Sequence, residues 1–527
     1  MMKNRKILGM ITAICLLSGS AIAPFSAFAE DSAAPLIGDA NLDQMVDVAD
    51  AVLIARYYAE DATANLTDAG KKNADVNTDG NVDNRDLLQI MEFIARKRTS
   101  FTAEKPAEKL MTTVDMMEGL KRSDAVEKKV DDAFIENQFD LTAKLLKQIT
   151  QNAEEKENVL ISPLSMSLAL TMAANGAGGE TLDEMQQLLG NDIALTDLDA
   201  YFYDYVSQLP STDKAKLDIA NSIWIKDDLN QIIVPDEFLQ TNKNYFDAGV
   251  FRAPFNSGTV YDVNAWVSKK TNGMIEEMIT EFSPLDVMTI INALYFDAEW
   301  ENKYTGYQVN PGDFYTDESL DFSEYINYYE SESRYTVDYL DGREDYYVQD
   351  DNAVGFVKPY AGGQYSFVGL LPNNGVTVQS YIDQMDGASL KKLMDSKKLN
   401  EDLVYTSLPK YKYSYDVELN ETLKALGMKQ AFDKDEADFT GLNKLGNTWI
   451  GEVLQKTAIE VNEEGTRASA VTAVRMEGGA GYPPEAVFVY LNRPFIYMIV
   501  DNSTNLPFFI GTVYHPTESE ETLHWFR

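Results

Sequence analysis

The chain has 527 residues, a hydrophobic content of 45% and a formal net charge of −39 at neutral pH. This length predicts two or more folded units, and so acidic a chain excludes nucleic-acid binding through a basic surface. No recognisable catalytic or zinc-binding motif surrounds the two histidines, His515 and His524, so histidine-dependent hydrolysis is disfavoured. A catalytic carboxylate pair stays open, because 84 acidic residues make chance pairs common.

The N-terminus is typical of a secretory signal peptide. Three cations within the first six residues precede an apolar run from Ile7 to Leu17, and Ala27-Phe28-Ala29 forms a small-x-small cleavage site. We therefore expect residues 1–29 to be removed and the protein to be secreted. A membrane anchor is the weaker alternative, because the run is short. The only cysteine, Cys15, lies in the leader, so the mature chain has no disulfide, thiol nucleophile or cysteine-ligated metal.

Two acidic segments, residues 39–50 and 75–86, predict calcium-binding loops. Each offers side-chain oxygens at loop positions 1, 3, 5, 9 and 12 and a backbone carbonyl at position 7. Calcium takes six to eight such oxygens. The expected ligands are Asp39, Asn41, Asp43, Met45, Asp47 and Asp50 in the first loop, and Asp75, Asn77, Asp79, Asn81, Asp83 and Asp86 in the second. Position 6 is Gly80 in the second loop but Gln44 in the first, so we rank the second site higher.

These loops, each followed by a helical pattern, resemble a dockerin module over residues 38–96. The resemblance implies a small all-α unit with two EF-hand-like loops that bind Ca²⁺. It also implies a cohesin domain of a scaffolding protein as partner, and hence a cellulosome-type assembly. In that family loop positions 10 and 11 contact the cohesin, here Val48 and Ala49, and Asn84 and Arg85. Helix-capping turns are the weaker alternative.

The rest of the N-terminal region predicts connecting segments. Residues 30–37 form a short segment before the repeats. Residues 97–130 are rich in Lys, Glu, Thr and Ala, which favours a tether between two units. Residues 517–527 are expected to be a C-terminal tail.

From about residue 131 the composition becomes that of a globular α+β domain. Apolar periodicity predicts helices at 134–149, 166–174 and 181–189. Later apolar runs predict strands at 217–225, 287–296, 354–358, 365–371, 403–408, 450–459, 486–490, 495–501 and 508–514. Helices that come early and strands that come late argue against a wound βαβ sheet.

Five sequence blocks occur in order in this domain. They are Asn158 to Ser165 with Gly176 to Thr181; Val263 to Val267 with Thr271 to Gly273; Asn292 to Phe296 with Trp300; Glu463 to Thr466; and Leu491 to Ile496. Together they resemble the serpin family over residues 131–516. The resemblance implies the serpin fold: three β-sheets, about nine helices and an exposed reactive-centre loop that inserts into the main sheet after cleavage. It implies no cofactor in this domain and no catalytic group.

The segment Glu463–Pro484 matches the reactive-centre loop. The expected hinge and inserting positions are Glu463, Glu464, Gly465, Thr466, Ala468, Ala470 and Thr472. The inserting face carries neither proline nor charge, and a buried unpaired charge would obstruct insertion. The family's usual loop length, counted forward from Gly465, implies a scissile bond at Gly479–Ala480, and counting back from Pro483-Pro484 implies Ala480–Gly481. Such small residues favour subtilisin- or elastase-like serine proteases, and cysteine proteases stay open.

The resemblance also implies a group of structural residues beneath the inserting strand. The family's shutter matches Ser162, Ser165, Asn292 and Gln455, and Trp300 matches the residue below the point where insertion begins. Our hypothesis is a secreted suicide inhibitor held on a cellulosome and free of the membrane once the leader is cleaved. The alternatives are a non-inhibitory serpin-fold binding protein and, less favoured, a dockerin-borne glycoside hydrolase.

Overall fold

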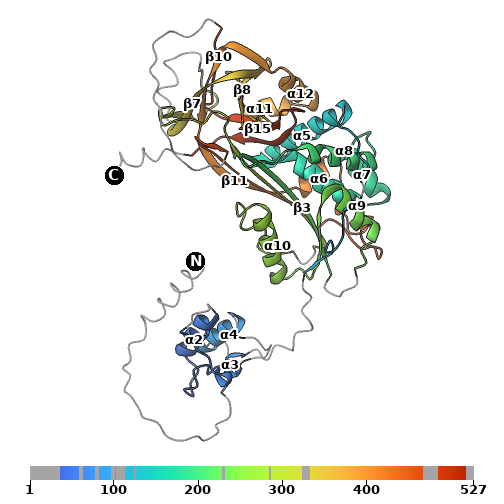
Figure 1. The fold of residues 1–527 in the computed structure, drawn as a ribbon, viewed down its shortest axis with the longest axis vertical. Coiled ribbons are helices and arrows are strands. Elements are labelled where there is room, and N and C mark those ends of the chain that lie inside the picture. Colours follow the sequence, from blue (N-terminus) through green and yellow to red (C-terminus); the bar gives the residue numbers. More distant parts are fainter. Residues whose placement is uncertain are drawn as a thin grey trace. The chain divides into compact units, whose positions relative to one another are not determined.

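The computed structural model describes most of the chain in two compact units (Figure 1). The described residues are 36–58, 63–76, 82, 84–96, 101, 113–123, 125–227, 232–283, 286–322, 333–466 and 485–517. One unit lies within residues 1–111 and the other within residues 112–527. Within these described ranges, no helix has both the length and the apolar character that a membrane span requires.

The smaller unit is all-helical around a compact apolar core. Its helices are α2 (Val48–Tyr58), α3 (Asp68–Ala74) and α4 (Asn84–Ile94). The buried residues Ala51 and Ile54 of α2 pack with Ile90 of α4. α2 and α4 are the helices expected after the two acidic loops, and α3 is an additional helix between them.

The larger unit has nine α-helices among its described residues, as many as expected. They are α5 (Asp132–Asn152), α6 (Pro163–Ala174), α7 (Gly179–Leu189), α8 (Leu195–Gln208), α9 (Asp236–Phe246), α10 (Ser257–Lys270), α11 (Val378–Gln384), α12 (Gly387–Asp395) and α13 (Asn420–Ala425), followed by the 3₁₀ turn η1 (Gln430–Phe432). Side chains fix where several begin: Asp131 accepts a hydrogen bond from Phe134 N, and Ser162 from Ser165 N.

The described strands form two sheets. The first has the order β1 (Val114–Asp115), β4 (Gly249–Ala253), β3 (Ala215–Lys226), β5 (Met288–Glu299), β13 (Gly465–Thr466), β12 (Glu452–Val461) and β11 (Tyr411–Glu418). The second has the order β14 (Val487–Tyr490), β10 (Lys398–Pro409), β7 (Arg334–Gln349), β8 (Ala353–Pro359), β9 (Tyr365–Pro372), β15 (Phe495–Asp501), β16 (Pro507–Val513) and β2 (Leu160–Ile161), with β6 (Val309–Tyr315) paired to β7.

The α+β architecture is as expected, but two of the three expected sheets are continuous. The 16-residue strand β7 pairs with β6 at its start and with β8 at its end. β10 pairs with β7 over both halves of that strand. Because one long strand belongs to both regions, hydrogen bonding joins them into a single nine-stranded sheet.

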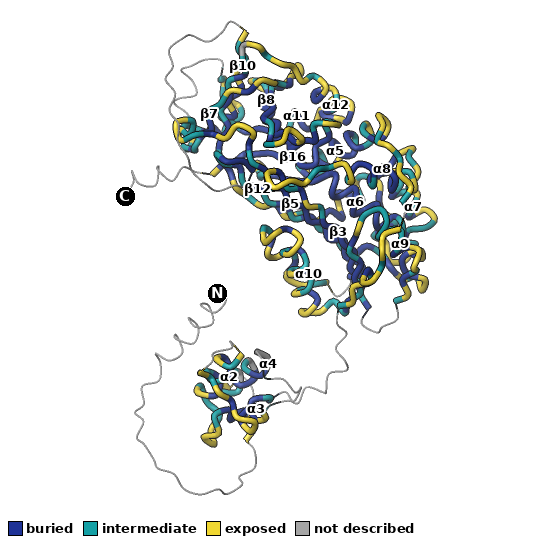
Figure 2. Tube along the Cα trace, in the orientation of Figure 1, coloured by how far each residue is buried: buried dark blue, intermediate teal, exposed yellow. Residues whose placement is uncertain are grey.

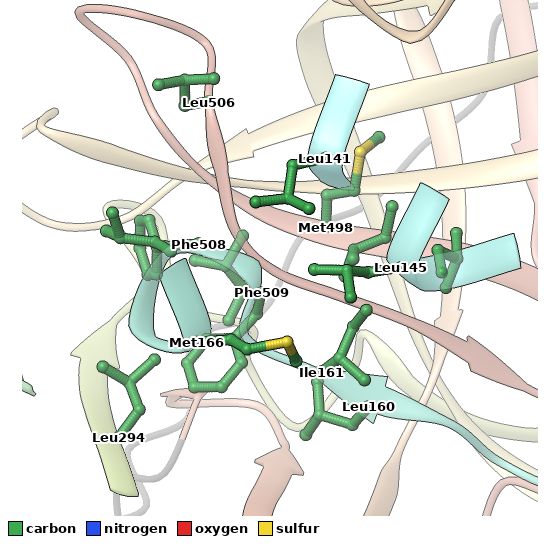
Figure 3. Packing of buried hydrophobic residues seen from close by; sticks show 14 of the residues in the cluster. Leu141, Leu145, Leu160, Ile161, Met166, Leu294, Met498, Leu506, Phe508 and Phe509 are labelled. Atoms are coloured by element: carbon green, nitrogen blue, oxygen red, sulfur yellow. The ribbon is translucent and has the colours of Figure 1, made fainter. Parts of the chain in front are cut away.

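The main core lies on the inner face of the first sheet. Every residue of α6 is buried, which is typical of a helix that is apolar on all sides. Figure 3 shows Met166 of α6, Leu294 of β5 and Phe509 of β16 in this cluster. On the outer face, α10 packs Val263 and Val267 against the sheet and is largely exposed on its other side (Figure 2).

The expected tether from residue 97 to 130 is wrong in its second half. Val114 and Asp115 pair with Arg252 and Phe251 of β4, and Met117 is buried in the main core. Arg122 Nε donates to the carbonyl of Asn244 at 2.9 Å. Residues 113–123 and 125–130 therefore belong to the larger unit, because backbone and side-chain contacts join them to it despite a tether-like composition.

A buried carboxyl on α8 should make the stability of the larger unit depend on pH. Asp199 is 3% exposed and accepts one hydrogen bond from Asn175, and burial raises its pKa from 3.8 to about 7. Because the unfolded chain releases this proton at lower pH, the carboxyl destabilises the fold progressively from about pH 4 to pH 7. Asp199→Asn should therefore raise the free energy of unfolding increasingly over this range, by at most about 4 kcal/mol at pH 8.

Urea unfolding of wild type and variant at several pH values measures this difference. The exposed carboxyl of Asp192, which precedes the same helix, supplies the control substitution Asp192→Asn. A constant difference between Asp199→Asn and wild type from pH 4 to pH 8 would contradict the assignment.

Candidate functional site

The two residues of β13 occupy a position between β5 and β12 at one end of the first sheet. Thr466 pairs with Ala298 of β5 and with Val461 of β12, antiparallel to both. A Cβ atom on Gly465 would lie 2.0 Å from the carbonyl oxygen of Ala298. This hinge position therefore requires glycine because the neighbouring backbone leaves no room for a side chain.

Trp300 anchors the hinge from beneath. It is 1% exposed, and its indole Nε1 donates to the carbonyl of Asn462 at 2.8 Å. Its ring stacks on Tyr360 with centroids 4.6 Å apart. The Tyr360 hydroxyl and Thr466 Oγ1 share a hydrogen bond of 2.6 Å, so Tyr360 links Trp300 to the side chain of Thr466.

Two lysines neutralise the paired glutamates before the hinge. Lys303 Nζ lies 2.7 Å from Glu464, whose side chain is 11% exposed, and this hydrogen bond raises the pKa of Lys303. Lys410 Nζ lies 3.7 Å from Glu463. These ion pairs hold the segment that leads into β13, and neither lysine was identified from the sequence.

Below β13, β5 and β12 pair directly with each other. Their parallel ladder runs from Thr289 with Glu452 to Ala293 with Lys456. Between this ladder and β13, residues 294–297 and 457–460 have no ladder pair with each other in the strands that the structure describes. Thr466 pairs with Val461 of β12 and Ala298 of β5, whose residue numbers differ by 163 (461 − 298). The directly paired residues Gln455 and Asn292 differ by the same number (455 − 292). A strand continuing from β13 would thus keep one register with both neighbours.

A buried polar cluster lies where the ladder closes, and we call it the amide network. Asn292 Nδ2 donates to Ser165 Oγ at 2.5 Å and to Asn221 Oδ1 at 2.6 Å. Gln455 Nε2 donates to Asn292 Oδ1 at 2.6 Å. Gln455 also donates to the carbonyl of Ser162 and accepts from its N–H. The network is Ser162, Ser165, Asn221, Asn292 and Gln455, and all five are buried.

The structure thus brings together the four residues expected as the shutter and adds Asn221 from β3. Asn221 stands in an otherwise apolar run, Ile219 to Ile223, apart from the serine that follows it. A polar side chain in a buried strand signals a partner, because an unpaired buried amide is costly. The sequence therefore indicated that Asn221 has a buried partner, but it did not indicate that the partner is Asn292.

Removing the central amide should destabilise the larger unit. Asn292→Ala deprives Ser165, Asn221 and Gln455 of a buried partner and leaves a cavity, so we expect a loss of about 2–4 kcal/mol in the free energy of unfolding. Urea unfolding measures it. Ser167→Ala is the matched control, because the Ser167 hydroxyl donates only within its own helix, to the Pro163 carbonyl. Equal losses for the two variants would contradict a special role for the network.

The first acidic loop of the smaller unit is organised by its terminal carboxylates. Asp39 accepts hydrogen bonds from the backbone N–H groups of Asp43 (3.0 Å) and Gln44 (2.8 Å). Asp50 accepts from those of Asn41 (3.0 Å) and Asp47 (2.9 Å). Gln44 has a φ of 70°, the left-handed conformation that glycine adopts without strain.

The donor set of this loop fits a hard cation by chemistry. Asp50 is fully buried, and desolvation raises its pKa, so a cation nearby would relieve the cost of its charge. Within the residues described, however, no three acidic or histidine side chains are gathered as a metal-binding group. Met45, at loop position 7, is exposed. The loop therefore has the oxygen-donor residues that calcium prefers, but the structure does not show them gathered around one point.

Other expected site residues are partly or wholly outside the described chain. In the second loop Asp75 and the buried Asp86 are described, whereas Asn77, Asp79, Asn81 and Asp83 are not. At the start of α2, Val48 is half-buried and Ala49 exposed; the side chains of Asn84 and Arg85 lie outside the described residues. So do residues 1–35 and the loop residues Ala468, Ala470, Thr472, Gly479, Ala480 and Gly481.

Comparison with protein-family models identifies both units. The model "Serpin (serine protease inhibitor)" matches residues 136–516, and the model "Dockerin type I domain" matches residues 37–95. The chain belongs to the serpin family. Its N-terminal unit is a type I dockerin, so this is a serpin joined to a dockerin module.

Known proteins and structures agree with this assignment. Iripin-3 of Ixodes ricinus is 31% identical over 373 residues, which cover 68% of this chain and 89% of that protein. Human neuroserpin is 27% identical over 399 residues, covering 74% and 93%. The thermophilic serpin tengpin in its native state is 45% identical with a TM-score of 0.69, covering 77% of this chain and 100% of that chain.

This combination of units sets the broad class of function. A serpin unit with a dockerin supports a serpin-type protease inhibitor that is anchored to a cellulosome. Serpins are generally inhibitors of proteases and not catalytic enzymes, which disfavours the glycoside hydrolase alternative. The serpin match, residues 136–516, spans almost the whole larger unit.

Proposed function

We propose that the protein inhibits serine proteases by suicide-substrate trapping. The protease serine attacks the carbonyl of the scissile bond, the peptide bond breaks, and the resulting ester is trapped when the loop inserts into the first sheet. The observation that carries this proposal is β13, which already lies between β5 and β12 in a register that continues to Asn292 and Gln455. The chain itself supplies no catalytic group.

The register of β13 predicts where each inserted residue would lie. Thr466 pairs with Ala298 in an antiparallel ladder, so each step forward along the loop is a step back along β5. Ala468 would therefore oppose Phe296, and Ala470 would oppose Leu294. Thr472 would reach Asn292 and Gln455, whose own pairing has the same offset. From Ala468 to Thr472 the inward face would therefore receive only small side chains over the core, and the threonine hydroxyl would enter the amide network.

The outward face would receive two arginines beside carboxylates. In the same register Arg467 would lie between Asp297 and Glu460. Arg475 would lie beside Glu452, whose pKa desolvation and the nearby Asp286 and Glu418 raise to about 7. Opposite charges on adjacent strands stabilise a sheet, so the arginines favour insertion.

A direct test is the formation of a covalent complex with subtilisin. The small residues at Gly479, Ala480 and Gly481 suit a shallow or tolerant pocket, so subtilisin or an elastase-like protease should yield a complex that survives denaturing electrophoresis. Thr472→Arg would place a charge among the buried amides, and we expect cleavage of the loop with at least a tenfold smaller yield of complex. Cysteine proteases of papain type form the second panel.

The matched control places the same charge on the other face of the loop. Ser469→Arg would lie opposite Tyr295 on the outward face, near Asp297 and Glu460, and should retain the complex. Cleavage without any complex in the wild-type protein would favour the non-inhibitory alternative. An equal loss of complex in both variants would contradict the register.

We also propose secretion through residues 1–29 and attachment through calcium-dependent binding of the dockerin to a cohesin. Calcium binds the folded loops and so stabilises them. The second loop ranks higher because its sixth position is Gly80. The cohesin would contact the start of α2, with Val48 and Ala49, and the start of α4, with Asn84 and Arg85.

Removal of calcium should abolish cohesin binding and leave protease inhibition unchanged. Titration calorimetry with a recombinant type I cohesin, with and without EGTA, measures this. Asp79→Ala should weaken binding more than Asp43→Ala, and Asp68→Ala, an exposed acid at the start of α3, is the control. Binding that persists in EGTA, or equal effects of all three substitutions, would contradict the proposed calcium sites.

A further inference from the structure

Residues 300–304 follow β5 and bind the residues that lead into β13. The backbone N–H of Trp300 donates to the carbonyl of Glu464 at 2.9 Å, and that of Tyr304 donates to the carbonyl of Glu463 at 3.0 Å. Together with the indole bond described above, these bonds fix three consecutive residues immediately before the hinge glycine. The position of the hinge therefore depends on what holds segment 300–304 in place.

A buried lysine holds this segment. Lys358 of β8 is 2% exposed, and its Nζ donates to the carbonyl of Asn302 at 3.1 Å. The same ammonium lies 4.3 Å from the centroid of the Tyr304 ring and 5.4 Å from that of Trp300. One cation thus contacts three residues of the segment, through a hydrogen bond and two cation–π interactions.

The strand β7 supplies the counter-charge and the space for one of the rings. Glu344 is buried, and its Oε1 lies 2.8 Å from Lys358 Nζ. Burial raises the pKa of Glu344, and the charge of Lys358 opposes this rise. Two residues earlier, a Cβ atom on Gly342 would lie 2.9 Å from the ring of Tyr304. The absence of a side chain at this position lets the ring pack against β7.

Stability alone does not account for this ion pair. Desolvation of two buried charges offsets much of their attraction, and apolar side chains of similar volume often replace such a pair without loss. Replacement of one partner is different, because it leaves a single buried charge unpaired and strongly destabilises the fold. A role of Lys358 and Glu344 beyond stability can therefore be isolated by replacing both residues together.

We propose that Lys358, held by Glu344, is a positioning residue for loop insertion: it fixes segment 300–304, and this segment keeps residues 462–464 in the place from which β13 enters the sheet. Without this hold, β13 would leave its position between β5 and β12 more often. Insertion would then start later, and water would hydrolyse more of the ester before it is trapped. The effect on inhibition rests on the proposed function, whereas the effect on the hinge does not.

The double variant Lys358→Met/Glu344→Leu tests the hinge directly, because it removes both charges and leaves neither unpaired. Hydrogen–deuterium exchange of the full secreted chain, read by mass spectrometry, reports on the peptide that contains residues 462–466. We expect this peptide to exchange about tenfold faster than in the wild type, while the urea midpoint of the larger unit stays close to the wild-type value.

Leu145→Ala is the control for lost stability. Leu145 is 1% exposed on α5, so its truncation should lower the urea midpoint. It should leave exchange at residues 462–466 unchanged, because these amides exchange through local opening. Tyr304→Leu is a second variant that keeps the ion pair and removes the ring that Lys358 contacts, and we expect about threefold faster exchange at the hinge.

Equal hinge exchange in the wild type and the double variant would overturn the proposal. Should the double variant fail to fold, unchanged exchange in Tyr304→Leu would overturn it instead. With subtilisin, the double variant should yield several-fold less covalent complex and more cleaved chain than the wild type. Faster exchange with an unchanged yield would overturn the link to inhibition, and a wild-type protein that forms no complex would fail the proposed function alone.

Discussion

The hydrogen bond between Gln455 and Asn292 links β12 to β5 within the buried amide network. It joins β12 to β5 where the ladder pairs them, and Asn292 also donates to Ser165 of α6 and Asn221 of β3. Gln455 has its other partners in the backbone of Ser162, the N-cap of α6. Because all these groups are buried, they are satisfied only by one another. Above this point the two strands part, and among the described residues only the two of β13 lie between them. β5 and β12 are therefore paired directly at one end, and at the other end β13 lies between them.

The hinge is fixed by contacts of three kinds. Gly465 gives the close backbone approach, Trp300 gives a hydrogen bond and an aromatic floor, and Lys303 pairs with Glu464. Each acts on the residues before or within β13. If the loop inserts as we propose, β13 would be the start of the added strand, and the residues after it would have to part the ladder at the amide network.

Local sequence patterns predicted those elements whose apolar periodicity is strong. The strand expected at 495–501 is observed with the same bounds, and the helices expected at 166–174 and 181–189 correspond to α6 and α7 to within a few residues. Asn221 was missed because its partner Asn292 is 71 residues away and only strand register brings them together. β1 was missed because two strand residues at the end of a charged segment have no periodicity to detect. The continuity of β7 likewise depends on pairing and not on composition.

The position of β1 has a mechanical consequence. The chain from the dockerin enters the larger unit at the far edge of the first sheet, where β4, β3 and β5 separate β1 from β13. β1 has only two residues, so a pull transmitted from a cohesin would detach this short strand before it loaded the strands around the hinge. If the protein is held on a scaffold as we propose, a pulling force would break this short edge pairing first and would leave the strands around β13 in place.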